Sequence, residues 1–350
     1  MLEHAIVTLI PLGRFPGRRA LTWHGEVLYA SEGYTLWRWE PGNATSEWTR
    51  VARYRPGWMR RLSAATRLGY RLRRDGFHAL AVFPDGTLVA VLPKAIAIAR
   101  PGDTGFQVTW RVRRGTRPLD LVVTPAGAVY WGEYFDNPKR EPVHVYGSLD
   151  GGRTWEVVYT FPAGSIRHVH SITYDRYADC LWVLTGDYGR ECGIMRVSPD
   201  WRTVETMLSG SQQTRAVHPV PMPDGLYFAT DTELEMNSIY RLGRDGSLER
   251  LASIAGSGMR GCQVGKALFF STAVEPSRVN RHPFACLYGS ADGRVWEKLV
   301  EWRKDRWPMR LFQYGNILLP QGANETGILA ATGMAVRGED GVMHLWRVAQ

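Results

Sequence analysis

The sequence predicts an all-β chain built from a repeated antiparallel hairpin, and three observations support this prediction. The segment 148–155 reads Ser-Leu-Asp-Gly-Gly-Arg-Thr-Trp, and a version one residue shorter returns at 290–296. Each copy stands between two runs of alternating character, so Asp and Gly supply a turn and Trp opens the outgoing strand. The 350 residues also include 37 Gly and 14 Trp with little helical periodicity, which favours many short strands joined by tight turns.

The two hairpins belong to a longer repeat with a period of roughly 40 to 50 residues, a spacing typical of propeller blades. Each unit begins with an apolar strand, turns at Pro, Asp or Gly, and continues as an aromatic-rich strand. Seven such units predict a seven-bladed β-propeller of four-stranded antiparallel blades, in one domain of residues 1–350. The expected blades are residues 18–52, 70–113, 116–162, 166–208, 212–253, 257–301 and 307–350. The last blade lacks an outer strand, and we expect residues 4–11 to supply it and to close the ring.

The Ser-x-Asp-x-Gly-x-Thr-Trp pattern at 148–155 is the Asp-box, and the chain resembles the Asp-box (BNR-repeat) β-propellers of the sialidase-like superfamily. The match at 290–296 has Val295 in the Thr position, and Ser198, Asp200 and Thr203 form a partial copy. The resemblance extends to propeller glycoside hydrolases and polysaccharide lyases, although such folds also serve non-catalytic receptors. Sialidase activity itself is not expected, because the Arg-Ile-Pro signature is missing near the N-terminus.

The charge and the cysteine content of the chain limit the kinds of ligand that it could bind. The formal net charge is +9, and eight arginines lie between Arg53 and Arg74. This stretch is either a solvated basic loop or a surface that attracts an acidic polymer, and without a nucleic-acid motif we favour a polysaccharide. The four cysteines lack the spacing of a zinc site, so we expect them to be mostly reduced and buried.

The sequence does not predict targeting to a membrane or a compartment. No apolar run reaches the roughly 20 residues that a membrane-spanning helix needs. Residues 1–12 lack the basic leader of a signal peptide, so the protein is either cytoplasmic or secreted with its leader removed. Neither nucleic-acid binding nor membrane insertion is expected, and the oligomeric state stays open.

The phase of the blades indicates where chemistry would occur. The start of each first strand and the loop after each second strand share one face, and the Asp-box turns lie on the other. Arginine recurs at the expected starts of first strands, as Arg117, Arg167, Arg215, Arg260 and Arg310. These arginines either bond neighbouring blades or form an anion-binding centre for carboxylate or sulfate groups.

The other candidate residues follow second strands or begin the fourth blade. The loops after second strands carry Glu133, Tyr134, Asp187, Glu191, Asp231 and Asn237. His168 and His170 are two apart on an expected strand and therefore project to the same side. Such a pair can bind metal, but the sequence fixes no third ligand, so we expect no metal and no other cofactor.

Together these residues favour a carbohydrate-active enzyme that cleaves an acidic, uronate-containing polysaccharide or oligosaccharide. In a lyase, Arg167 or Arg215 would neutralise the uronate carboxylate, while His168 or His170 took the proton and Tyr134 protonated the leaving oxygen. A glycosidase would instead use two carboxylates from among Glu133, Asp187, Glu191 and Asp231. Because no catalytic signature is complete, the alternative is a non-catalytic propeller that binds an anionic glycan or a protein partner.

Overall fold

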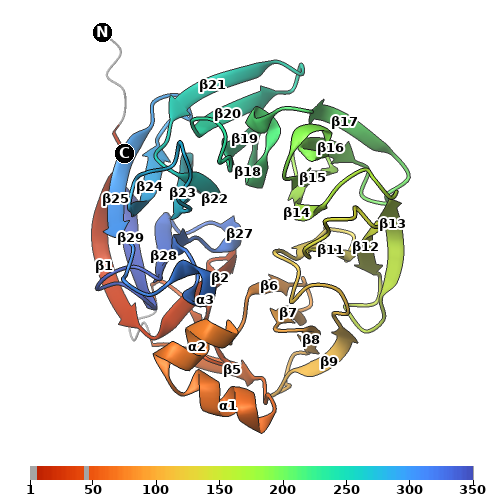
Figure 1. Ribbon diagram of the computed structural model, residues 1–350. Coiled ribbons are helices and arrows are strands. Elements are labelled where there is room, and N and C mark those ends of the chain that lie inside the picture. Colours follow the sequence, from red (N-terminus) through yellow and green to blue (C-terminus); the bar gives the residue numbers. More distant parts are fainter. Residues whose placement is uncertain (1–5, 43–46, 350) are drawn as a thin grey trace.

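The computed structural model describes residues 6–42 and 47–349, and its strands form antiparallel sheets around a central axis (Figure 1). In most sheets the earliest strand lies nearest the axis and later strands lie progressively outward. The protein is therefore an all-β propeller with four-stranded antiparallel blades, as the sequence predicts.

Five four-stranded meanders stand in separate sheets. The first is β2 (Arg18–Gly25), β3 (Val27–Glu32), β4 (Thr35–Trp39) and β5 (Thr49–Arg53), and the second is β6 (Ala79–Val82), β7 (Leu88–Leu92), β8 (Ala95–Ala99) and β9 (Gln107–Arg111). The third is β10 (Val122–Val123), β11 (Val129–Gly132), β12 (Val143–Ser148) and β13 (Glu156–Phe161), and the fourth is β14 (His168–Asp175), β15 (Cys180–Gly186), β16 (Gly193–Val197) and β17 (Val204–Ser209). The fifth is β18 (Ala216–Met222), β19 (Gly225–Thr230), β20 (Ser238–Gly243) and β21 (Leu248–Ser253). The short strand β27 (Gln321–Asn324) joins the first sheet by pairing in parallel with β2.

The remaining strands form a single eight-stranded sheet, so the predicted count of seven separate blades is not confirmed. The sheet contains β22 (Ser257–Val264), β23 (Ala267–Val274), β24 (Phe284–Ser290), β25 (Glu297–Arg303), β26 (Gly315–Leu318), β28 (Ile328–Met334), β29 (Val342–Ala349) and β1 (Thr8–Pro16). Two pairs, Ala273 with Asn316 and Val274 with Gly315, join β23 to β26 and make the sheet continuous. This contact links strands far apart in sequence, which a local repeat cannot predict.

The N-terminal strand pairs with the C-terminal one. β1 runs antiparallel to β29, from Thr8 opposite Ala349 to Pro16 opposite Val342. The predicted outer strand covered residues 4–11, of which 4 and 5 lie outside the described residues, and the observed strand continues further along the chain. Both ends of the described chain thus lie in one sheet.

Blades pack face to face, and this explains the burial of their inner strands. All five residues of β7 and all five of β8 are buried, whereas in the outer strand β9 both end residues are exposed and the three between them are half-buried. A strand covered on both faces reads as a continuous apolar run, and a strand at the rim keeps one polar face. Trp131 and Tyr146, which are cross-strand partners in the third blade, stack with their ring centroids 4.3 Å apart and pack against the second blade.

The Asp-box segment forms the turn between β12 and β13, as expected. Asp150 accepts hydrogen bonds from the backbone N–H groups of Arg153 and Thr154, both at 3.0 Å, and from the Thr154 hydroxyl at 2.7 Å. Gly152 has a φ of +83°, and a Cβ there would approach the side chains of Val89 and Ile98 in the neighbouring blade to 3.0 Å. The turn therefore needs glycine both for its backbone conformation and for its packing.

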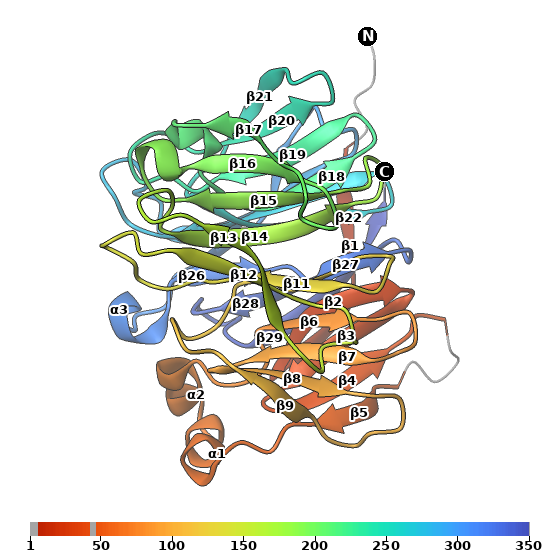
Figure 2. The ribbon, with the colours of Figure 1, turned by 90° about the vertical axis from the view of Figure 1, so that its right-hand side faces the viewer.

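The basic stretch is folded into helices rather than a loop. α1 (Trp58–Ala64) and α2 (Arg67–Arg73) lie between the first two blades, and α2 packs beside α3 (Met309–Phe312). All three project from the same face of the propeller (Figure 2). Helices this short carry a weak periodic signal, so the sequence did not reveal them. No helix among the described residues is long and apolar enough to cross a membrane.

Candidate functional site

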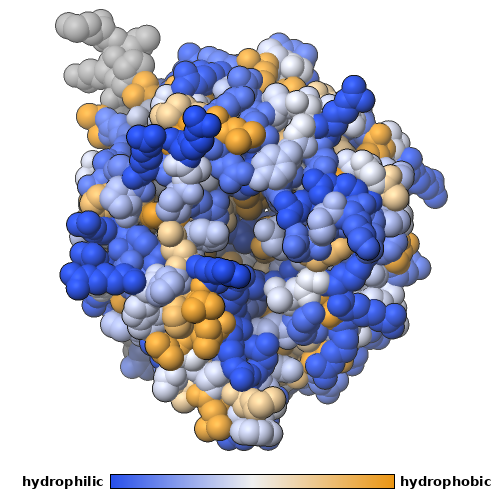
Figure 3. Space-filling view, in the orientation of Figure 1, coloured by the Kyte–Doolittle hydropathy of each residue, from blue (hydrophilic) through white to orange (hydrophobic). Residues whose placement is uncertain are grey.

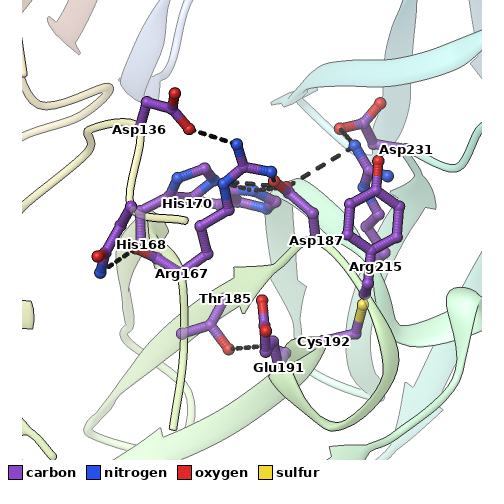
Figure 4. A network of polar contacts seen from close by, with 12 residues as sticks. Asp136, Arg167, His168, His170, Thr185, Asp187, Glu191, Cys192, Arg215 and Asp231 are labelled. Atoms are coloured by element: carbon purple, nitrogen blue, oxygen red, sulfur yellow. Dashed lines mark hydrogen bonds and ion pairs between the residues drawn. The ribbon is translucent and has the colours of Figure 1, made fainter. Parts of the chain in front are cut away.

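A polar cluster forms where the fourth and fifth blades meet the central axis. β14 begins at His168 and β15 ends at Gly186, and these two residues pair in register, so Asp187 emerges directly beside His168. The register shifts between Val169 and Ser171, which marks a β-bulge at His170. Bulges re-aim side chains, and here both imidazoles face Asp187 (Figure 4).

The three side chains make close contact in a buried setting. The Nε2 atoms of His168 and His170 are 3.1 Å apart, and the Asp187 Oδ1 atom lies 3.4 Å from the first and 3.2 Å from the second. Burial opposes ionisation of Asp187, but its close contacts with the two imidazoles outweigh this effect and hold the pKa of this carboxyl well below its ordinary value. Asp187 is thus an anion in the cluster.

Two arginines border this cluster (Figure 4). Arg167 donates to Asp187 Oδ2 at 3.1 Å and to Asp136 at 2.5 Å, and Arg215 lies 3.7 Å from both Asp187 and Asp231. Asp136 was not a sequence candidate, because an exposed acid in a loop carries no signal of its own. The sequence-predicted Arg167, Arg215, Asp187 and Asp231 therefore lie together, bound to one another by charge.

Tyr134 and a second pair of acids complete the surroundings. The Tyr134 ring packs against His168 with centroids 4.3 Å apart, and burial followed by the charge of Asp187 raises the pKa of its phenol to about 12. Burial and the neighbouring Glu275 carboxyl raise the pKa of Asp231 to about 7. Burial also raises the pKa of Glu275. The site therefore holds one firmly ionised acid and two acids that resist ionisation.

Three of the predicted site residues have structural partners instead. Glu133 is buried, pairs with Arg114 through both carboxylate oxygens, and accepts the His144 N–H at 2.9 Å. Glu191 pairs with Arg140 at 2.5 Å. The fully buried Asn237 donates to the Thr232 carbonyl and to Asn280, both at 2.9 Å.

The remaining candidate arginines are spread along the channel and its rim. Arg260 pairs with Asp120 and donates to the Leu119 carbonyl at 3.1 Å. Arg117 is half-buried, and burial and the charges of Arg74 and Arg19 lower its pKa to about 9. Arg310 is exposed on α3 and contributes nothing to the cluster. The expected ring of arginines is therefore only partly formed.

A cavity of about 550 Å³ lies at the other end of the channel. Its walls include the far ends of the first strands, with Tyr174, Tyr177, His218, Val220, Cys262 and Gln321 among them. Tyr174 stands at the opposite end of β14 from His168, so this cavity is on the face that carries the Asp-box turns. The sequence argument overlooked it because apolar first-strand residues carry no chemical motif.

Comparison with known proteins shows the fold and corrects the expected resemblance. No protein-family model matches the sequence, and no curated protein is similar to it. Among solved structures, the chain is similar to one from the mitotic checkpoint complex, with a TM-score of 0.58 and 11% identity over 100% of this chain and 99% of that one. It is also similar to the WD40 β-propeller domain of Doa1, with a TM-score of 0.58 and 10% identity over 97% of each chain.

These neighbours are WD40 β-propellers, so the predicted sialidase-like Asp-box family is wrong. The hydrogen bonds of the Asp150 turn explain the error. They are satisfied within the hairpin by Ser, Asp, Gly and Thr, and such a local solution can serve a blade of any propeller. The motif therefore specifies a turn and not a family.

Proposed function

We propose that this chain is a non-catalytic β-propeller that binds a protein partner through the face that carries α1, α2 and α3. The observation that carries the proposal is a group of seven large apolar side chains exposed in these helices and the segments around them. We call it the helical patch, and its members are Trp58, Met59, Leu62, Leu68, Leu72, Leu311 and Tyr314. Figure 3 shows hydrophobic surface over α1, α2 and α3, beside the hollow at the centre of the same face.

The degree of exposure argues for an interface. Trp58 is 70% exposed, and Leu62 is 66% exposed on the same helix. Isolated apolar residues on a surface are ordinary, but a contiguous patch rimmed by charge is typical of protein interfaces, where Trp and Tyr are favoured anchors. The helical patch gathers such exposed side chains on three helices of one face, with Trp58 and Tyr314 among them.

The charge of the same segment indicates an acidic partner. Arg60, Arg67 and Arg71 point inward and pair with Asp75, Asp340 and Asp305 of the protein itself. By contrast, Arg55, Arg61 and Arg73 are exposed. Exposed arginines around an apolar patch attract an acidic segment and orient it during association.

The carbohydrate-enzyme hypothesis has less support. Glu133 and Glu191, two of the four carboxylates available for hydrolysis, are neutralised by Arg114 and Arg140. An acidic glycan as ligand is likewise unsupported. The cluster around Asp187 still contains the groups named for a lyase, so turnover of uronate polysaccharides is the outcome that would contradict a non-catalytic role.

The test compares the wild-type protein with the double substitution Trp58→Ser and Leu62→Ser in quantitative affinity capture from native extract. Partners that depend on the helical patch should be at least tenfold depleted with the variant, and direct titration of the purified partner should reproduce that loss. Leu149→Ser is the matched control, because Leu149 is 74% exposed on the opposite face. Equal recovery by all three proteins would contradict the proposal, as would formation of unsaturated ends on a uronate polysaccharide panel.

We further propose that the eight-stranded sheet comprises two blades in one propeller domain of residues 1–350. β22–β25 would form one, and β26, β28, β29 and β1 the other, giving seven blades closed by β1. The antiparallel pairing of β1 with β29 supports this division, because it gives the last blade the outer strand that it lacks in sequence order.

A further inference from the structure

The geometry of His168, His170 and Asp187 points to a metal site. We propose that His168 Nε2, His170 Nε2 and Asp187 Oδ1 bind a divalent transition-metal ion, and that Zn²⁺ is the ion that best fits this donor set. The proposal is independent of the partner-binding function, because it concerns the channel mouth and not the helical patch. All three residues are at most 9% exposed.

The backbone fixes which ring nitrogen of each histidine is free. His168 Nδ1 lies 3.1 Å from the Phe135 carbonyl, and His170 Nδ1 lies 2.8 Å from the Ala216 carbonyl. A carbonyl oxygen only accepts, so each Nδ1 carries a proton, and in the neutral ring Nε2 presents its lone pair. This arrangement, in which the outer nitrogen donates to a carbonyl, is the one found around metal-bound histidines.

The three free electron pairs converge on one point. Two Nε2 atoms 3.1 Å apart and a carboxylate oxygen 3.2 and 3.4 Å away repel one another unless a positive charge lies between them. Metal–ligand bonds near 2.1 Å place neighbouring donors about 3.4 Å apart in tetrahedral geometry and about 3.0 Å apart in octahedral geometry. The observed separations of 3.1, 3.2 and 3.4 Å span these two values, so the choice of zinc rests on the donor set of two imidazoles and one carboxylate.

The surroundings hold the donors in place. Arg167 occupies Asp187 Oδ2, so Oδ1 is the oxygen that faces the imidazoles. The His170 ring lies against Gly186, where an added Cβ would meet the ring Cε1 atom at 2.5 Å. With three protein ligands, the fourth position stays available for water or for an anionic group, which Arg167 and Arg215 would attract.

A proton on one of the two Nε2 atoms is the competing explanation for the short distances within the cluster. If one histidine is an imidazolium, it can donate from Nε2 to the other ring or to Asp187, and the cluster needs no metal. Metal titration distinguishes these cases because a proton-filled cluster gives no stoichiometric binding.

The experiment titrates chelator-treated protein with Zn²⁺ by calorimetry and with Co²⁺ by visible absorption. We expect one ion per chain and the intense visible bands of tetrahedral Co²⁺. The substitutions His170→Gln and Asp187→Asn should each weaken Zn²⁺ binding by at least tenfold, and Gly186→Ala should weaken it by displacing the His170 ring. His218→Gln is the matched control, since it removes another buried histidine from the channel and should leave the affinity unchanged.

A measurement on the wild-type protein tests the same ligands without relying on variants, which could fail to fold. Electron spin echo spectra of Cu²⁺-loaded wild-type protein should show two coordinated imidazoles. Absence of stoichiometric Zn²⁺ binding would overturn the proposal, as would spectra without imidazole or wild-type affinity in His170→Gln. Tight Mn²⁺ binding with no preference for Zn²⁺ would overturn the assignment of a tetrahedral zinc site.

Discussion

Burial governs the charge of the histidines along the channel at the scale of single residues. His218, on β18, is 9% exposed and contacts Gln321 at 3.3 Å. Burial lowers the pKa of His218 to about 4 from its ordinary value of 6.5, and the charge of Asp120, which opposes this shift, is partly offset by that of Arg260. The unfolded chain therefore binds a proton between these two values while the folded protein does not, and stability falls as the pH drops from about 6.5 toward 4.

We predict that His218→Gln weakens this acid sensitivity. One pKa unit corresponds to about 1.4 kcal/mol, so the variant should lose about 2 kcal/mol less stability than the wild type between pH 6.5 and 4. Urea unfolding at a series of pH values measures the difference. His24→Gln, which removes an exposed imidazole, should keep the wild-type slope, and parallel curves for His218→Gln and wild type would refute the prediction.

The sequence located part of the site at this scale. His168 and His170 could be placed on one side from strand period alone, and Asp187 and Tyr134 were candidates from their position after second strands. The failure at Glu133 has a simple physical cause. Its partner Arg114 lies in a different segment, and only the folded chain shows which cation reaches a given carboxylate.

Local hydrogen bonds determine the hairpins at the scale of secondary-structure elements. We predict that Asp150→Ala destabilises the protein by about 1 kcal/mol, because several donors in the turn lose their acceptor while remaining partly solvated. Thermal unfolding measures this effect. Asp200→Ala is the matched control in the partial copy of the motif, where the carboxylate accepts from Ser198 and Arg202, and its effect should be smaller. An equal or larger effect at Asp200 would contradict the argument.

Attachment of the helices to the propeller depends on Arg71. This side chain is completely buried on α2, pairs with Asp305 and Asp340, and donates to the Phe312 carbonyl at 3.0 Å. We predict that Arg71→Ala costs about 2 kcal/mol, since it removes a buried donor from the Phe312 carbonyl and one of the two cations at each carboxylate, while Lys304 stays with Asp305 and Arg67 with Asp340. Urea unfolding with Arg73→Ala as the exposed control tests this, and similar losses in the two variants would contradict it.

Secondary-structure elements could be predicted from the sequence where neighbouring residues alone determine them. Turn residues and alternating runs identified the hairpins, and the expected start of the sixth blade at 257 coincides with the start of β22. The short helix α2 was not predicted because its contacts with Asp305, Phe312 and Asp340 come from more than 200 residues away in sequence. The junction of β23 with β26 escaped for the same reason.

Contacts between distant segments hold the whole molecule together. Arg260 on β22 pairs with Asp120, which precedes β10 and is 140 residues away. Arg71 joins α2 to the segment around α3, and β1 joins the start of the described chain to its end. These long-range contacts couple the blades, so we expect the propeller to unfold as one unit. Each contact closes a long loop of the chain, and closing that loop costs conformational entropy during folding.

The pairing of β1 with β29 leads to a prediction for the entire protein. A chain that starts at Gly17 lacks β1, so β29 becomes an edge strand with unpaired N–H and C=O groups along its length. We expect a lower melting temperature and association between copies through that edge, measured by calorimetry and by size-exclusion chromatography with light scattering. A chain that starts at Ile6 keeps β1 and serves as the control, so its melting temperature and mass should match the full chain. If the chain starting at Gly17 stayed monomeric with an unchanged melting temperature, β1 would contribute nothing to stability, and the last sheet would be protected by another part of the molecule.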